Sequence, residues 1–185
     1  MSKIINKTLI FCTFLMLVFS ANVVLAKSFI GVIGAAVGEI KNQNEQLLKT
    51  GSKIFYGDTI LSSKESNAQI LFLDQTVLTL GEDTELFIDD FVYNSDTQEG
   101  NFVTEIKSGT VKFITGQISK LNPENLEVKL PEGTLGARGT EFVVLSQKNK
   151  ESTVVLLGPG PNNTLGMIPG SLQISDGTNM VNITN

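Results

Sequence analysis

Apolar and polar residues alternate over short stretches of the chain, which is the pattern of half-buried β-strands. In residues 126–130, three apolar side chains alternate with Glu127 and Lys129, which predicts one buried and one solvent-facing side. Residues 68–73 and 77–80 are more apolar, and we expect strands covered on both faces and joined as a hairpin. Further strands are expected at 29–33, 38–41, 59–62, 86–88, 102–106, 111–114, 141–145, 153–157, 171–174 and 180–183.

Glycine, proline and Asp-Gly pairs separate these segments, with breaks expected at residues such as Ser108-Gly109. No segment has a convincing apolar stripe at helical spacing, although residues 42–49 and 119–125 are each suited to one turn of helix. The pattern predicts an all-β fold, with many short strands in a twisted sandwich or a β-solenoid-like roll after an N-terminal signal helix.

The N-terminal segment has the pattern of a secretory signal peptide. Lys3 and Lys7 precede an apolar run from Leu9 to Phe19, and small side chains end the segment at Ala26. We therefore expect cleavage after Ala26. The alternative is an uncleaved membrane anchor, because the apolar segment is nearly long enough to span a bilayer.

These features predict three parts of the chain: a signal peptide at residues 1–26, a β domain at 27–157, and a loop with a closing hairpin at 158–185. A signal peptide directs export, so the expected location is the periplasm or the outside of the cell. Contact with a membrane is expected only through the signal segment, if it stays attached.

The charge and composition exclude several classes of function. The 185 residues have a net charge of −5. Cleavage of the signal peptide would remove Lys3 and Lys7 and change the net charge to −7. Nucleic-acid binding is therefore not expected. The chain has no histidine and a single cysteine, Cys12, whereas zinc sites, imidazole bases and thiolate nucleophiles need these side chains. We therefore predict a protein that is not an enzyme and that has no cofactor and no metal site.

An ordered set of short motifs carries a resemblance to a known family. The motifs are Val37-Gly38-Glu39, Leu47 and Gly51, Gly57-Asp58-Thr59-Ile60, residues 68–74, Gly109-Thr110-Val111, and Leu135 to Phe142 with its Arg-Gly-Thr-Glu-Phe run. From about residue 31 to residue 144 the chain resembles the FecR domain family, best known as the periplasmic part of iron-siderophore signalling regulators.

The resemblance implies a β domain with a binding role, and a partner in the envelope such as an outer-membrane transporter or an inner-membrane regulator. The family regulators also have a cytoplasmic anti-sigma region to which no part of this sequence corresponds, so direct contact with a sigma factor is not expected. The family often has glycine where Gln75 stands. Because glutamine tolerates positive φ poorly, we expect a different turn there.

Arg138 is the only arginine of the chain and has Gly136 and Gly139 beside it. Its planar fork of donors suits a carboxylate of a partner. The alternative is a structural clamp on an acid of the chain, such as Asp58, Asp74 or Glu141. The candidate residues for partner binding or for a structural motif are Arg138, Gly136, Gly139, Thr140, Glu141, Phe142, Gly57, Asp58 and Asp74.

Two further groups of residues have competing interpretations. The acidic cluster of Glu82, Asp83, Glu85, Asp89 and Asp90 fits a solvated, charged sheet edge; the alternatives are a calcium site and a pair of glycosidase carboxylates. Aromatic residues at strand spacing fit the core or cross-strand pairs, with stacking faces for sugars as the alternative. These residues are Phe55, Tyr56, Phe91, Tyr93 and Phe113.

Together these observations predict a non-catalytic, exported, FecR-like domain of the bacterial envelope that binds another envelope protein in a signalling or scaffold role. β-Augmentation at an exposed strand edge is one way to bind such a partner. The alternative is a periplasmic or cell-surface glycan-binding module.

Overall fold

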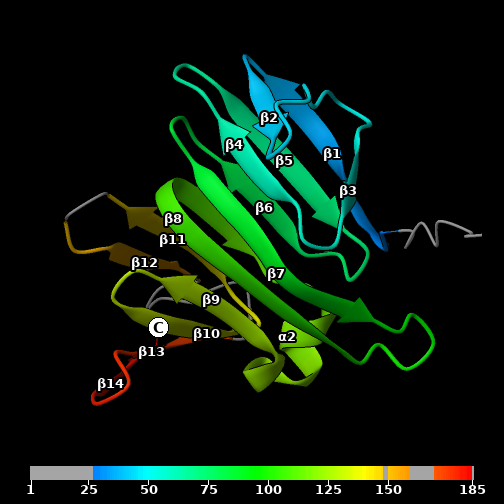
Figure 1. Cartoon of the computed structure of the whole chain (residues 1–185). Coiled ribbons are helices and arrows are strands. Elements are labelled where there is room, and N and C mark those ends of the chain that lie inside the picture. Colours follow the sequence, from blue (N-terminus) through cyan, green and yellow to red (C-terminus); the bar gives the residue numbers. More distant parts are fainter. Residues whose placement is uncertain (1–26, 148–149, 159–168, 185) are drawn as a thin grey trace, which may run out of the picture.

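A computed structural model describes residues 27–147, 150–158 and 169–184. These residues are mostly β, and their strands form one continuous, open, mixed sheet (Figure 1). The predicted all-β class is confirmed. The predicted signal helix lies outside the described residues. Within the described part of the chain, no helix has the length and apolar character to cross a membrane.

The sheet folds over so that two parts of it face each other; we call them layer 1 and layer 2. Layer 1 contains, in spatial order, β2 (Ile40–Asn42), β4 (Thr59–Ser62), β7 (Glu85–Tyr93), the first half of β8 (Gly100–Ile114), β9 (Leu126–Leu130), β10 (Gly133–Arg138), β13 (Ser171–Ser175) and β14 (Met180–Thr184). Within layer 1, β9 lies parallel to β8, and the other pairs are antiparallel.

Layer 2 contains, in spatial order, β3 (Lys53–Phe55), β1 (Phe29–Val37), β5 (Asn67–Phe72), β6 (Val77–Leu80), the second half of β8, β11 (Glu141–Ser146) and β12 (Thr153–Leu157). All of its pairs are antiparallel. In Figure 1 the layer 1 strands β4 and β7 lie in front of β5 and β6. The predicted hairpin of 68–73 with 77–80 is confirmed as β5 and β6.

Strand β8 joins the two layers, and the predicted break at Ser108-Gly109 is wrong. The strand pairs with β7 and β9 before this point and with β6 and β11 after it. Gly109 has φ of +96°, a conformation that glycine adopts without steric cost. The glycine therefore redirects the strand from one layer to the other without ending it.

The core lies between the layers. It is built from the inward-facing residues, which alternate with outward-facing ones along each strand. Phe72 of layer 2 has its ring centroid 4.7 Å from that of Phe102 in layer 1 and 5.5 Å from that of Phe91. The prediction that β5 and β6 are covered on both faces is wrong, since Leu71 exposes 39% of its surface. These strands alternate between buried and partly exposed residues like their neighbours.

The local predictions differ from the structure in three other places. Residues 42–49 form turns and an isolated bridge rather than a turn of helix. The helix expected within 119–125 is present as α2 (Gln117–Leu121) followed by the 3₁₀ turn η1 (Pro123–Asn125). Gln75 has φ of +71°, so it takes the left-handed conformation, and the expectation that glutamine would avoid it is wrong.

Candidate functional site

The structure distributes the predicted site residues over three places instead of one. Gly57 and Asp58 form the turn between β3 and β4, Asp74 lies in the turn between β5 and β6, and the run from Gly136 to Phe142 covers the end of β10 and the start of β11. Each place has a different set of contacts.

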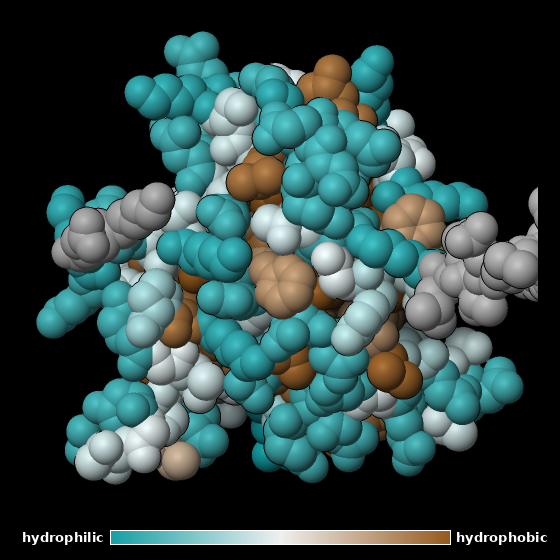
Figure 2. Space-filling model, in the orientation of Figure 1, coloured by the Kyte–Doolittle hydropathy of each residue, from teal (hydrophilic) through white to brown (hydrophobic). Residues whose placement is uncertain are grey.

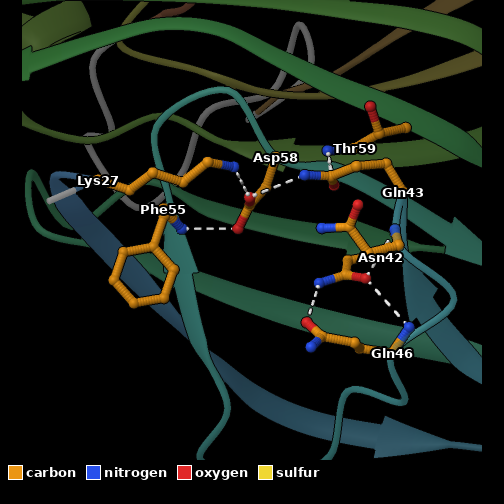
Figure 3. Close-up of polar contacts among 8 residues, drawn as sticks. Lys27, Asn42, Gln43, Gln46, Phe55, Asp58 and Thr59 are labelled. Atoms are coloured by element: carbon orange, nitrogen blue, oxygen red, sulfur yellow. Dashed lines mark hydrogen bonds and ion pairs between the residues drawn. The ribbon is translucent and has the colours of Figure 1, made fainter. Parts of the chain in front are cut away.

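Asp58 is a buried carboxylate that ties several segments together (Figure 3). Its Oδ2 accepts a hydrogen bond of 2.9 Å from the backbone N–H of Phe55. Its Oδ1 lies 2.8 Å from Lys27 Nζ and 3.3 Å from Gln43 Nε2. Gln43 in turn accepts a 2.9 Å hydrogen bond from the backbone N–H of Thr59. The Gly57-Asp58 motif thus closes a turn and fastens Lys27, which precedes β1, to the domain.

We expect the change Asp58→Ala to lower the free energy of unfolding by about 2 kcal/mol, because it leaves the Phe55 N–H and the Gln43 amide without their buried acceptor. The change Lys27→Met removes only a pair whose lysine is half exposed, and should cost less than about 1 kcal/mol. Urea denaturation of both variants measures the difference. Equal effects would contradict a structural role for the Asp58 hydrogen bonds.

Asp74 is fully buried and also structural. Its side chain accepts hydrogen bonds of 3.0 Å from the backbone N–H and 2.7 Å from the hydroxyl of Thr76, and its backbone C=O accepts one of 2.8 Å from the backbone N–H of Gln117 in α2. Burial raises the pKa of the Asp74 carboxyl, and the hydrogen bonds from Thr76 oppose that increase. Asp74 therefore joins the β5–β6 turn to the start of α2.

The motif residues after Arg138 also build the fold. Thr140 is buried and exchanges hydrogen bonds with Thr115, and the ring of Phe142 stacks on that of Phe113 at 4.6 Å. Glu141 forms an ion pair with Lys112 on the neighbouring strand. Among the predicted aromatic residues, Phe91 and Phe113 belong to the core, as the sequence interpretation favoured.

Arg138 and Gly136 lie on an open groove of about 620 Å³ on the outer face of layer 1. Arg138 is exposed, and no ion pair or hydrogen bond of its side chain is found within the described residues. The clamp interpretation is therefore wrong for this part of the chain: Asp58 pairs with Lys27, and Glu141 pairs with Lys112. The guanidinium faces the groove, where a ligand can reach it.

The floor of the groove is the backbone at Gly136. In the sheet register Gly136 lies between Glu127 of β9 and Gln173 of β13, and Gln173 lies opposite Asn182 of β14. Directly opposite residues of a sheet share a face, so these polar side chains form one row with a gap at Gly136. The amides of Gln173 and Asn182 are hydrogen-bonded to each other at 3.2 Å.

The comparisons with known proteins identify the family. A profile described as FecR protein matches residues 58–158, which is more than half of the chain and runs from the Asp58 turn through β12. The chain belongs to the FecR family. No curated protein and no solved structure shows a match to it.

FecR proteins are signalling-related regulators that act with other envelope proteins, and the family is not enzymatic. Their FecR domain is typically periplasmic. The matched FecR segment contains the motif run of Gly136 to Phe142, together with Asp58 and Asp74. It ends before β13 and β14, so the side of the groove that carries Gln173 and Asn182 lies outside the match.

The acidic cluster does not form one site in the described residues. Glu85 pairs with Lys107 at 3.1 Å, Asp89 with Lys129 at 2.6 Å, and Asp90 accepts a 2.7 Å hydrogen bond from Asn101. No group of three acidic side chains with metal-binding geometry is found in the described part. The interpretation as a sheet edge fits Asp89 and Asp90, because β4 pairs with β7 only at residues 85–87 and, within the described residues, the following part of β7 pairs with β8 alone. It does not fit Glu85, which lies between β4 and β8.

Sequence reasoning missed the residues that surround Gly136, namely Glu127, Gln173 and Asn182. The sequence does show that each stands at a polar position within an alternating strand. It does not show which strands are neighbours, and only the register of β9, β10, β13 and β14 brings these positions into one row.

Proposed function

We propose that this FecR-family chain is a non-catalytic domain of the bacterial envelope that binds another envelope protein, in a signalling or scaffold role, by adding a strand of that partner to β12. The proposal includes export by a signal peptide at residues 1–26, a binding domain at 27–157, and a loop with a closing hairpin at 158–185. The observation that carries it is the free edge of layer 2 at β12.

Within the described residues, β12 pairs only with β11. The backbone N–H and C=O of Thr140 are hydrogen-bonded to Thr115, which directly follows β8. Along a strand, the backbone groups of successive residues point alternately to the two neighbouring strands. By this alternation Val143 directs its own groups toward Val155 in β12. The N–H and C=O of Val154 and Leu156 then point to the free side, where an added strand can pair with them.

The surroundings of β12 also suit a peptide partner. The strand has no charged residue, although charges commonly protect exposed strand edges. On the outer face of layer 2, Ile114, Val155 and Leu157 expose 41, 47 and 38% of their surfaces. Beside the strand, a hollow of about 370 Å³ is lined by the apolar Val154, Leu130 and Ile174 and by the acidic Glu132, Glu151 and Asp176. An added strand would place alternate side chains on this outer face and into this hollow.

The opposite side of the molecule has a different character. The face shown in Figure 2, over β4 and β7, is largely hydrophilic, and hydrophobic residues emerge singly or in small groups among the coloured residues. Contiguous exposed apolar patches mark interaction surfaces, whereas scattered apolar residues do not. On the outer face of layer 2, Glu141 lies between Leu157 and Ile114 in the register, so the exposed apolar residues of that face are also interrupted by charge. The free backbone groups of β12 are therefore what favours layer 2 as the protein-binding surface.

The test is site-specific photo-crosslinking in the native bacterium, with a benzophenone amino acid at position 155. We expect one major crosslinked envelope protein. The change Leu157→Lys should reduce the crosslinked fraction at least about tenfold. A partner strand that pairs with β12 would then have to remove water from the ammonium group of the lysine. The matched control is Val181→Lys on the β14 edge, since Val181 is exposed by 57%, and it should leave the crosslink unchanged.

Two results would overturn this assignment. One is an envelope crosslink from position 181 of β14 with none from position 155. The other is a crosslink at position 155 that survives Leu157→Lys at full yield.

A further inference from the structure

We propose that the groove above Gly136 binds a neutral saccharide, as a second site that is separate from the protein-binding edge at β12. The argument rests on the absence of a side chain at Gly136, on the chemistry of the side chains around it, and on the hydrogen bonding of the sheet beneath it.

The groove exists because residue 136 has no side chain. A Cβ added to Gly136 would meet only the backbone oxygen of Leu126, at 3.8 Å, and would otherwise project into the open space. Neighbouring strands lie about 4.8 Å apart, so Glu127 and Gln173 on either side are about 10 Å from each other. The volume of about 620 Å³ lies within the usual range for small-molecule sites, roughly 300 to 1,000 Å³.

Polar side chains of several kinds surround the gap. Along β10, Thr134 and Arg138 lie on the same face as Gly136, one on each side, since side chains alternate along a strand. Across the strands, Glu127 supplies a carboxylate and Gln173 supplies an amide. The gap thus has a hydroxyl, a guanidinium, a carboxylate and an amide on its four sides, with both donors and acceptors of hydrogen bonds. Further hydroxyl and amide groups line the outer part of the groove: Ser171, Ser175, Asn182 and Thr184.

This chemistry favours a ligand with many hydroxyl groups. The lining residues whose side chains point outward from β10, β13 and β14 are all polar or glycine, so an apolar ligand would find little surface to cover. A peptide strand is also disfavoured, because β10 is already hydrogen-bonded to β9 on one side and to β13 on the other. Its backbone has no free groups for strand addition. A saccharide needs only side-chain partners, and the groove provides them.

The charge balance favours a neutral saccharide over an acidic one. Glu124 and Glu127 line the groove together with Arg138, and the whole chain has a net charge of −5. An anionic chain would meet repulsion from both carboxylates. The lining residues include no aromatic side chain, so we expect weak binding, with Kd of about 1 mM.

The experiment is a titration, followed by NMR, of the ¹⁵N-labelled protein isolated from the periplasm of an expressing bacterium. The probes are a tetramer of N-acetylglucosamine and cellotetraose. We expect at least one of them to shift the backbone amides of Gly136 and Gln173 and the side-chain amide of Asn182. The amides of β12 should not shift, which keeps this site distinguishable from the protein-binding edge.

The variant Gly136→Val should weaken binding at least tenfold, because its side chain fills the groove floor. Valine suits a strand, and its Cβ meets no close neighbour, so the variant should fold. The matched control is Thr79→Val, which changes a residue on the outer face of layer 2 in β6 and should leave the Kd unchanged. A second variant, Gln173→Ala, should weaken binding several-fold without altering the floor.

Three results would overturn the proposal. One is the absence of shifts with both saccharides at about 10 mM, ten times the expected Kd. Another is binding that Gly136→Val does not weaken. The third is obtained with an additional probe, a short alanine-terminated peptide. If this peptide shifts the same amides and neither saccharide does, the groove is a peptide site.

Discussion

Replacing Gly109 by alanine is expected to lower the free energy of unfolding by about 4 kcal/mol, the largest effect that we expect from a single methyl group in this protein. Gly109 stands where β8 passes from layer 1 to layer 2. A Cβ at this position would lie 2.3 Å from Thr84 Oγ1 and 2.4 Å from Thr84 Cα. The second contact is with backbone, so a rotation of the threonine side chain cannot relieve it.

The positive φ of Gly109 adds to the clash. A residue with a Cβ pays about 1–2 kcal/mol in the left-handed conformation, and overpacking adds typically about 1–3 kcal/mol. Gly51 separates the two contributions, because its φ is +87° and an added Cβ there would have no neighbour within 4 Å. Gly51→Ala should therefore cost only about 1 kcal/mol. Equilibrium urea denaturation of both variants measures the difference, and equal losses would show that β8 does not need close packing at its bend.

The second large effect is expected at Asp74. The change Asp74→Ala should cost about 3 kcal/mol, because it leaves the backbone N–H and the hydroxyl of Thr76 without their buried acceptor. Asp74→Asn keeps one side-chain oxygen and should cost about half as much. Thermal and urea unfolding of the two variants measure these losses, and an Asp74→Ala protein as stable as the parent would contradict the structural role.

The Asp74 carboxyl also gives the stability a pH dependence. Burial raises its pKa in the folded state above the ordinary value of 3.8, so the folded protein holds this proton more tightly than the unfolded chain. The contribution of Asp74 to stability is therefore fully present below that value and decreases as the pH rises through the raised pKa.

The matched comparison is with Asp74→Asn, which cannot titrate at this position. The stability of the parent relative to Asp74→Asn should be greatest at acidic pH and should shrink as the pH rises from about 3 to 7. Unfolding measured for both proteins across this range provides the test. A stability difference that grows with pH would show that hydrogen bonding, rather than burial, dominates the pKa of Asp74.

The strands were predictable where the alternation of side chains was strict. Residues 126–130 form a strand with the predicted bounds, because apolar side chains alternate with charged ones along it. Residues 153–157 also have the predicted bounds, but the signal there was a short run of β-branched and apolar residues and not an alternation. Strand β3 was missed since three residues are too few to show a period. Strand β10 was missed because its two glycines, Gly133 and Gly136, resemble a turn in sequence. In the sheet, Gly136 occupies an ordinary outward position with no side chain.

The candidate site was less predictable than the strands. Sequence motifs drew attention to Arg138 and Gly136, and both lie on the groove. The same motifs included Asp58, Asp74 and Thr140, whose side chains make buried hydrogen bonds within the fold. A sequence motif does not separate a residue that holds a turn from one that faces a ligand. That distinction depends on strand register and burial, and neither has a local signal.

The passage of β8 through both layers has a consequence for folding. The strand hydrogen-bonds to β7 and β9 in layer 1 and to β6 and β11 in layer 2. If either layer unfolds, β8 is disturbed, and the strands of the other layer lose a hydrogen-bonded neighbour. The two layers should therefore unfold as one cooperative unit. Within the described residues, the hairpin of β13 and β14 pairs with the sheet along β10 alone, so it should open at a lower cost than the two layers, the cost being set mainly by the buried Leu172. One side of the groove would then separate from Gly136 while the rest of the domain stays folded.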